Sequence, residues 1–173
     1  MELTGKRVAI LAEETYEDLE LWYPALRLRE AGAQVTIVGS GSAATYHSKH
    51  GYPVTVDVDA AQVSADDFDA LVVPGGYAPD RLRRYPAVLE LVRNVFEQHK
   101  IVAMICHAAW VPISAGILEG RTATCVAAIK DDIINAGAAY VDREVVVDGH
   151  LISSRFPADL PAFCRAIIAG LKS

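Results

Sequence analysis

The chain has 173 residues, enough for one domain with a substantial core, and we expect a single domain over residues 1–173. Hydrophobic residues make up 52% of the chain and charged residues 22%, the balance of an ordinary globular protein. The net charge of −6 comes without a basic stripe, so we expect no nucleic acid partner. Neither a signal peptide nor an apolar run of membrane-spanning length is present, so we expect no membrane partner and a cytoplasmic location.

The cysteine pattern agrees with that location. Cys106, Cys125 and Cys164 are odd in number and widely spaced, which argues against a disulfide framework and against a zinc site. His47 and His50 fall in a stretch that we interpret as a surface hairpin and not as metal ligands. We therefore expect neither a metal nor an organic cofactor, and we expect Cys125 and Cys164 to be core residues.

The first forty residues predict a strand, a helix and a second strand. Residues 7–12 and 34–39 are short apolar runs typical of buried strands, and residues 19–31 have helical spacing. Gly32 ends that helix, and Pro24 predicts a kink or a late start. The apolar residues at helical spacing are Leu19, Trp22, Leu26 and Leu28. Strand, helix and strand in this length form a right-handed βαβ unit with parallel strands.

The middle of the chain predicts an excursion and a third parallel strand. Residues 45–58 contain a period of two and turn residues, which indicates a β-hairpin at one edge. Residues 70–73 are the third strand, and Pro74-Gly75-Gly76 follows it directly. Residues 81–85 indicate a basic loop or short turn. Residues 86–99 form an amphipathic helix whose inner residues are Val88, Leu91, Val92, Val95 and Phe96.

The last third continues the alternation. Residues 101–105 are an apolar strand, and residues 108–115 predict a helix that Gly116 ends. Residues 121–126 predict a short strand, and residues 130–136 predict a short helix. A hairpin is expected between residues 140–148 and 151–154, and residues 158–171 form the closing helix. The pattern predicts a doubly wound α/β fold with its ligand site at the carboxyl ends of the strands.

Cys106 stands at such a strand end, between a buried strand and a helix. A tight turn there points the side chain out of the sheet, and the helix start favours negative charge, so we expect these effects to favour the reactive thiolate. The backbone N–H groups of Gly76 and His107 are candidates for stabilising an oxyanion. Glu17 and Glu20 share one helical face and are candidates for moving protons.

Each of these residues also has a simpler interpretation. Cys106 can be an inert core cysteine, and His107 can face away from it because neighbouring side chains diverge. Glu17 and Glu20 can form a solvated first helical turn. Gly75 and Gly76 can serve a sharp turn instead of a close approach to a ligand.

Nearly the whole chain resembles the ThiJ/PfpI superfamily, and the PfpI intracellular protease branch fits better than the branch of the Parkinsonism-associated protein deglycase. The matching segments are Tyr16-Glu17-Asp18-Leu19-Glu20, Tyr23-Pro24, Lys49-His50-Gly51-Tyr52, residues 68–76, Ile105-Cys106-His107, Ile113-Ser114-Ala115-Gly116, residues 129–137, residues 144–148, Ser153-Ser154-Arg155 and residues 157–160. The resemblance implies a flavodoxin-like or Rossmann-like three-layer α/β sandwich of the class I glutamine amidotransferase-like kind. It also implies a homodimer or homohexamer.

The resemblance implies roles for the candidate residues. Cys106 matches the cysteine of a nucleophile elbow, Glu20 the acid that hydrogen-bonds the thiol, and Glu17 a second acid near the pocket. Gly76 and the backbone of His107 match the oxyanion site, and Gly75 lies beside them. The protease proposal for the PfpI branch adds a glutamate from a neighbouring protomer, where this chain has the shorter Asp80.

Another departure is Ala108-Ala109-Trp110, where many relatives have Gly-Pro and a smaller or polar residue. We expect Trp110 to line or narrow the mouth of the pocket.

Three functions follow as expectations. The first is a stress-protective glyoxalase or deglycase that needs no glutathione and converts methylglyoxal or glyoxal to lactate or glycolate, with Cys106 as nucleophile and Glu20 moving the proton. The second is a cysteine peptidase or amidase that uses Cys106, His107 and a partner's carboxylate, acting on peptide or glycated substrates. The third is a redox-sensing or chaperone-like stress protein in which Cys106 oxidises beside Glu20.

Overall fold

A seven-stranded sheet forms the centre of the molecule, which a computed structural model describes over residues 1–173. Its strands are β1 (Arg7–Ala12), β2 (Gln34–Gly39), β5 (Val58–Asp59), β6 (Ala70–Val73), β7 (Ile101–Ile105), β10 (Val146–Asp148) and β11 (Leu151–Ser154). Across the sheet they lie in the order β10-β11-β7-β6-β1-β2-β5, and only β10 is antiparallel to its neighbour. The predicted, mostly parallel sheet is confirmed.

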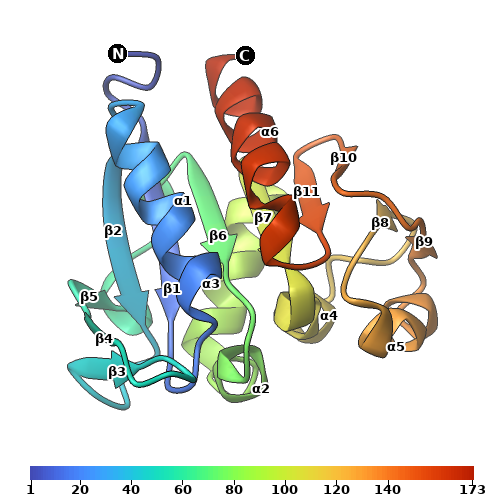
Figure 1. Cartoon of the computed structure of the whole chain (residues 1–173), viewed down its shortest axis with the longest axis horizontal. Coiled ribbons are helices and arrows are strands. Elements are labelled where there is room, and N and C mark those ends of the chain that lie inside the picture. The colour runs from blue at the N-terminus through green and yellow to red at the C-terminus, as the bar shows by residue number, and fades with distance from the viewer.

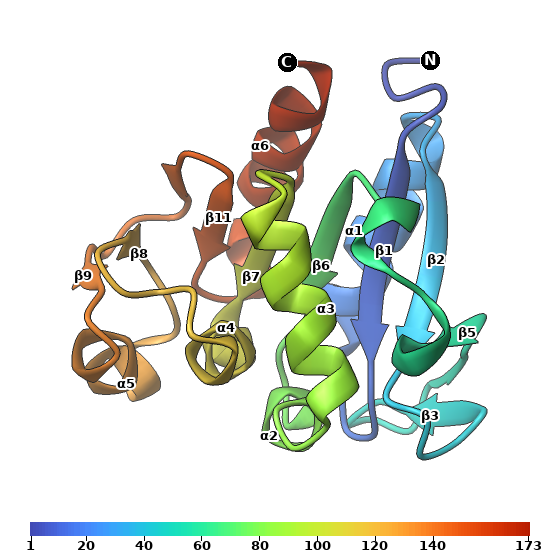
Figure 2. The same ribbon diagram turned by 180° about the vertical axis from the view of Figure 1, so that it is seen from behind.

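Helices cover both faces of this sheet. They are α1 (Asp18–Glu30), α2 (Ala78–Leu82), α3 (Pro86–Glu97), α4 (Trp110–Ala115), α5 (Lys130–Asn135) and α6 (Leu160–Lys172). Helices α1 and α6 lie together on one face (Figure 1), and α3 lies on the other (Figure 2). This is the expected three-layer α/β sandwich. No helix combines the length and the apolar composition needed to cross a membrane.

Two small sheets lie outside the central one. Strands β3 (Thr45–His47) and β4 (Pro53–Thr55) form an antiparallel hairpin, as predicted. Strands β8 (Thr122–Ala123) and β9 (Ala139–Tyr140) pair in parallel with each other. The expected strand over residues 121–126 is therefore shorter than predicted, and the expected long hairpin arm over residues 140–148 is divided between β9 and β10.

The central strands follow from their composition. Every residue of β6 and β7 is buried, because helices cover both faces of a parallel sheet and an apolar side chain is needed on each. The amphipathic prediction for α3 is confirmed in detail. Its helix begins at Pro86, and its buried residues are Val88, Leu91, Val92, Val95 and Phe96.

Helix α1 differs from the prediction in its start and in its inner face. It begins at Asp18, and Pro24 is accommodated inside the helix. Leu19 and Leu26 are 55% and 60% exposed, whereas the buried residues are Glu20, Leu21, Pro24, Ala25 and Leu28. The predicted Leu28 is buried and Trp22 is partly buried against the core, but the inner stripe also includes a carboxylic acid, which counting apolar side chains does not reveal.

The expected loop over residues 81–85 is also wrong in part. Helix α2 begins at Ala78 and includes Arg81 and Leu82. Leu82 is fully buried, and this tertiary burial stabilises a turn of helix that the local basic sequence does not indicate.

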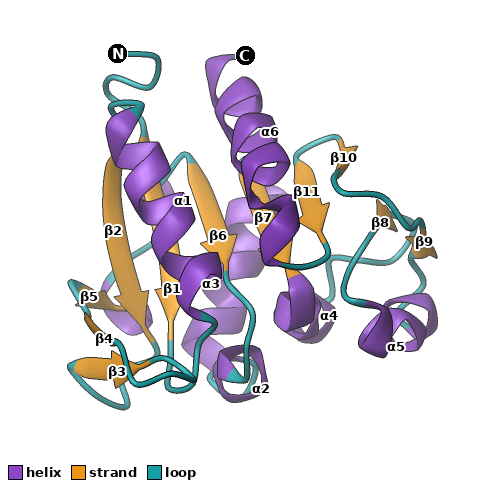
Figure 3. Ribbon diagram, in the orientation of Figure 1, coloured by secondary structure: helices purple, strands orange, loops and turns teal.

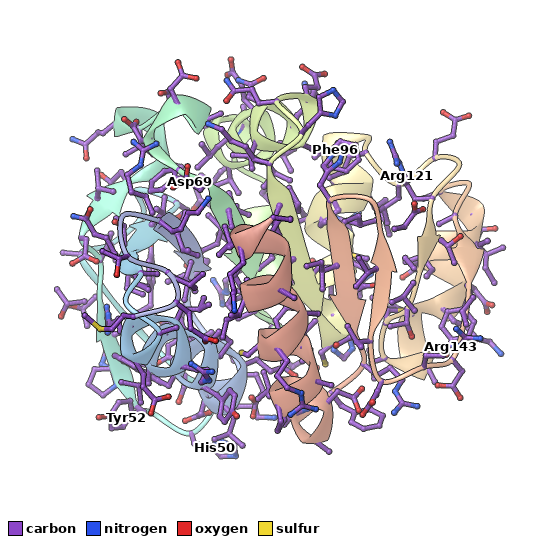
Figure 4. All side chains as sticks on the ribbon, turned by 90° about the horizontal axis from the view of Figure 1, so that it is seen from above. His50, Tyr52, Asp69, Phe96, Arg121 and Arg143 are labelled. Atoms are coloured by element: carbon purple, nitrogen blue, oxygen red, sulfur yellow. The ribbon has the colours of Figure 1, made fainter.

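The carboxyl ends of the central strands meet at one edge of the sheet, the lower edge in Figure 3, and the β3–β4 hairpin packs beside it. Polar contacts connect the hairpin to the start of α1 and to the residues just before it. Ser48 Oγ donates to Asp18 Oδ1 at 2.6 Å, His50 Nδ1 lies 2.8 Å from Asp18 Oδ2, and Tyr16 OH donates to the carbonyl of Tyr52 at 2.6 Å. Figure 4 shows His50 and Tyr52 beside the ribbon of α1.

Replacing Asp18 is expected to loosen this hairpin. In Asp18→Ala, both side-chain hydrogen bonds to Asp18 are lost, at a cost of about 1 kcal/mol for this partly exposed group, so amides of residues 45–55 should exchange about five-fold faster in hydrogen-exchange mass spectrometry. Asp66→Ala is the matched control, because that exposed carboxylate bonds only Gln98 of the side chains. Unchanged protection of the hairpin in Asp18→Ala would contradict the assignment.

Candidate active site

Cys106 stands at a strained turn at the end of β7. Its φ of +63° is in the left-handed region, which is uncommon for a residue with a side chain. A short 3-10 segment, Cys106–Ala109, begins there and leads into α4. Since β7 lies between β6 and β11, the thiol stands near the middle of the carboxyl edge of the sheet. The predicted tight turn is confirmed.

Glu20 lies directly behind this turn. It comes from the first turn of α1, is fully buried, and accepts a hydrogen bond from the backbone N–H of Gly75 at 2.8 Å through Oε2. Its other oxygen, Oε1, is buried and has no hydrogen-bond partner in the chain. The interpretation of Glu20 as a solvated helical residue is therefore wrong.

The two glycines after β6 are required by close approaches within the chain. A Cβ on Gly75 would lie 2.9 Å from Cys106 Cβ and would overlap the Glu20 carboxyl. Gly76 has a φ of +79°, and a Cβ there would lie 2.5 Å from the backbone nitrogen of Glu17. Gly75 and Gly76 thus let the acid, the nucleophile and the start of α1 converge.

The burial of Glu20 changes its acidity. Burial, and then the neighbouring Glu17, raise the pKa of Glu20 to about 8, so it holds its proton at neutral pH. Glu17 caps α1 by accepting from Glu20 N at 2.9 Å, which fixes the two side chains relative to each other.

The thiol does not behave as the strand-end argument predicts. Burial, and then the charge that Glu20 carries when ionised, raise the pKa of Cys106 to about 12. The backbone N–H groups of His107 and Gly76 act in the opposite direction, toward the thiolate, but burial outweighs them. The two N–H groups that favour the thiolate are the candidates for stabilising an oxyanion on a carbon bonded to the sulfur.

His107 faces Cys106. Its Nδ1 lies 3.3 Å from Cys106 Sγ, a hydrogen-bond distance for sulfur. Burial, and then the positive charge of Lys49, lower the pKa of His107, so its imidazole is neutral at pH 7 and able to accept a proton. The Trp110 ring lies 5.2 Å from the His107 ring, and Trp110 Nε1 donates to Asp132 at 2.8 Å.

Lys49 is the residue at this site whose role sequence reasoning missed. Its Nζ lies 3.6 Å from Glu17 Oε1, although 32 residues separate the two in sequence. The segment Lys49-His50-Gly51-Tyr52 was part of the family resemblance, but only the docking of the hairpin on α1 reveals where Lys49 lies. Asp80, in contrast, forms an ion pair with Arg84, just beyond the end of α2, and does not join Cys106 and His107 within the chain.

Known proteins resemble this chain over nearly its whole length. The profile of the DJ-1/PfpI family matches residues 6–170. A deglycase of Pyrococcus abyssi is 48% identical over 166 residues, and the deglycase PfpI of Pyrococcus furiosus is 46% identical over 166 residues; each alignment covers 96% of this chain and 99% of the relative.

Among solved structures, Drosophila melanogaster DJ-1beta superposes with a TM-score of 0.91 at 30% identity, covering 96% of this chain and 90% of the other. This match confirms the fold and the expected superfamily. The match to the two deglycases covers nearly the full length of each protein, and the profile covers most of the chain. The chain therefore belongs to the DJ-1/PfpI family.

Proposed function

We propose that the protein is a stress-protective enzyme that converts reactive α-oxoaldehydes, such as methylglyoxal and glyoxal, to hydroxy acids without glutathione or any other cofactor. The observation that carries this proposal is the fully buried Glu20, which accepts from Gly75 N–H and packs close to Cys106 at the strained turn. Converting an oxoaldehyde to a hydroxy acid needs a nucleophile at C1 and one group that moves a proton from C1 to C2. Cys106 and Glu20 supply these two functions.

The first step forms a hemithioacetal. Sγ of Cys106 attacks the aldehyde carbon, and its proton passes to the neutral imidazole of His107, 3.3 Å away. The aldehyde π electrons move to the oxygen, where the N–H groups of His107 and Gly76 stabilise the charge. Glu20 donates its proton to that oxygen and becomes the carboxylate.

The second step moves a proton between carbons. The Glu20 carboxylate removes the hydrogen from C1, and the C–H electrons form the C1–C2 double bond while the C2 oxygen takes the proton held by His107, which gives the enediol. Glu20 returns its proton to C2, and the C1 hydroxyl gives its own proton back to Glu20 as the C1 carbonyl forms, which leaves a thioester on Cys106. Water then attacks the thioester carbonyl, a water proton passes through His107 to the leaving sulfur, and lactate or glycolate is released. The net reaction adds one water, and no electrons are gained or lost.

The names of the relatives support this class of chemistry. Proteins 48% and 46% identical to this chain are called deglycases. Removing free or reversibly bound aldehyde through the same hemithioacetal would lower glycation of proteins.

A peptidase or amidase is the second candidate, and the Cys106–His107 contact favours it. In a peptidase or amidase mechanism the acyl group of the substrate is transferred to Cys106. A neighbouring protomer of a homo-oligomer then contributes a carboxylate such as Asp80. Its ion pair with Arg84 must then open or reorient. Hydrolysis of peptide substrates that disappears in Asp80→Asn would support this candidate over the first.

The first proposal predicts turnover that needs both members of the pair. Wild-type protein should form lactate from methylglyoxal without glutathione, and Cys106→Ala and Glu20→Gln should each lower kcat/KM by about a hundred- to ten-thousand-fold. Lactate is measured enzymatically. Cys125→Ala, which removes a buried thiol outside the pair, is the matched control and should retain activity. Full turnover by Cys106→Ala would exclude the proposal.

The acidity of Glu20 predicts the pH profile. The active form carries the proton on Glu20, so kcat/KM should fall as the pH rises through about 8, where the carboxylate forms and also opposes ionisation of Cys106. Glu17→Gln removes a charge that raises the pKa of Glu20, so the falling limb should move to lower pH. A rate that continues to rise up to pH 9.5, as for an ordinary thiol, would contradict this.

A further inference from the structure

The turn of the β3–β4 hairpin presents Lys49 to the active site. The turn itself is held by backbone and side-chain bonds: Lys49 N donates to the carbonyl of Tyr16 at 2.9 Å, and Ser48 Oγ accepts from Tyr52 N at 2.9 Å. The contacts of Ser48 and His50 with Asp18 stabilise the turn further. The backbone that carries the Lys49 side chain is therefore fixed by hydrogen bonds.

The ammonium group is available to a ligand. Its one ion-pair partner is Glu17, at 3.6 Å, which is longer than a hydrogen bond, and no acceptor in the chain takes a hydrogen bond from Nζ. The Lys49 side chain is 42% exposed, whereas that of Glu17 is 9% exposed. A lysine carries three donors, so the ammonium group of Lys49 has donors free for a ligand.

The charges near the active site determine how strongly an anion is attracted to it, and Lys49 is the positive charge among them. Glu20 keeps its proton at neutral pH and His107 is neutral, which leaves Glu17 and Lys49 as the two opposed charges that act on this pair of side chains. Glu17 accepts a hydrogen bond from Glu20 N, and Glu20 in turn acts on Cys106. Without Lys49, the carboxylate of Glu17 would repel an anion from the pocket; with it, the exposed member of the pair is positive.

We infer that Lys49 is a specificity-determining residue that binds the anionic group of the substrate, so that the enzyme favours oxoaldehydes carrying a carboxylate or phosphate over neutral ones. The inference rests on the proposed function for the identity of the reaction. The electrostatic part can be tested without turnover, since it concerns access of anions to Cys106.

The first test compares alkylation of Cys106 by iodoacetate and by iodoacetamide. In both reactions the sulfur forms a bond to the CH2 carbon, iodide leaves and the thiol proton is released, so the thiolate fraction cancels in the ratio of rates. Mass spectrometry assigns the alkylated residue, and Cys125 and Cys164 are each only 1% exposed. The iodoacetate-to-iodoacetamide ratio should fall about three- to ten-fold in Lys49→Met, the effect of one charge several ångströms away.

Two variants control this measurement. Lys49→Arg keeps the charge and should keep the wild-type ratio within about two-fold. Lys172→Met removes a lysine of similar exposure, 50%, that pairs with Glu2 at 3.4 Å at the far end of α6, and it should also leave the ratio unchanged (Figure 1). Thermal unfolding of each variant checks that the fold is retained. A ratio in Lys49→Met equal to that of the wild type would overturn the inference.

The second test uses turnover of a matched substrate pair, 4,5-dioxopentanoate and 2-oxopentanal, which differ in a terminal carboxylate against a methyl group. We expect the wild type to favour the anion in kcat/KM and Lys49→Met to lose that preference by a similar factor. Equal preference in the two proteins would overturn the inference and leave the proposed function intact. No turnover of either substrate, with an alkylation ratio that still depends on Lys49, would overturn the proposed function alone.

Discussion

The site depends on one constraint: a fully buried carboxylic acid, Glu20, packs against Gly75 close to the half-buried thiol of Cys106. A fully buried carboxylate without a cation against it is costly, so Glu20 keeps its proton and satisfies one oxygen with Gly75 N–H. That neutral acid is what allows negative charge to develop on the sulfur or on an oxygen next to it. If Glu20 were ionised, it would oppose that charge. Much of the surrounding geometry serves to hold this pair together.

The sheet order explains how residues far apart in sequence meet there. Strand β6 lies between β1 and β7, so the segments that follow these three strands are neighbours at one edge. They contribute, in turn, the acids at the start of α1, the two glycines, and the elbow cysteine. The absence of side chains at Gly75 and Gly76 lets these segments pack at contact distance. The order of the strands therefore brings these residues together, and no single sequence motif contains all of them.

Sequence reasoning succeeded where the signal was local. The apolar run 101–105 and the helix beginning at Pro86 have patterns that fix their burial, and the fold class follows from their alternation. It failed where tertiary packing decides: Leu19 and Leu26 are exposed while Glu20 is inside, α2 replaces a loop, and β8 pairs with β9 outside the main sheet. The prediction that Cys106 favours the thiolate was wrong for the same reason, because burial raises the pKa of the thiol more than the local N–H groups lower it.

Lys49 shows how a peripheral element acts on this buried pair. Asp18 holds the hairpin through Ser48 and His50, and the hairpin places the ammonium beside Glu17. The two charges act oppositely on Glu20: Glu17 raises its pKa and Lys49 lowers it. Burial has the largest effect on that pKa, and the position of the exposed hairpin modifies it through Lys49. In the proposed mechanism Glu20 gives up and regains its proton in each turnover, so a peripheral hairpin influences a proton transfer at a buried acid.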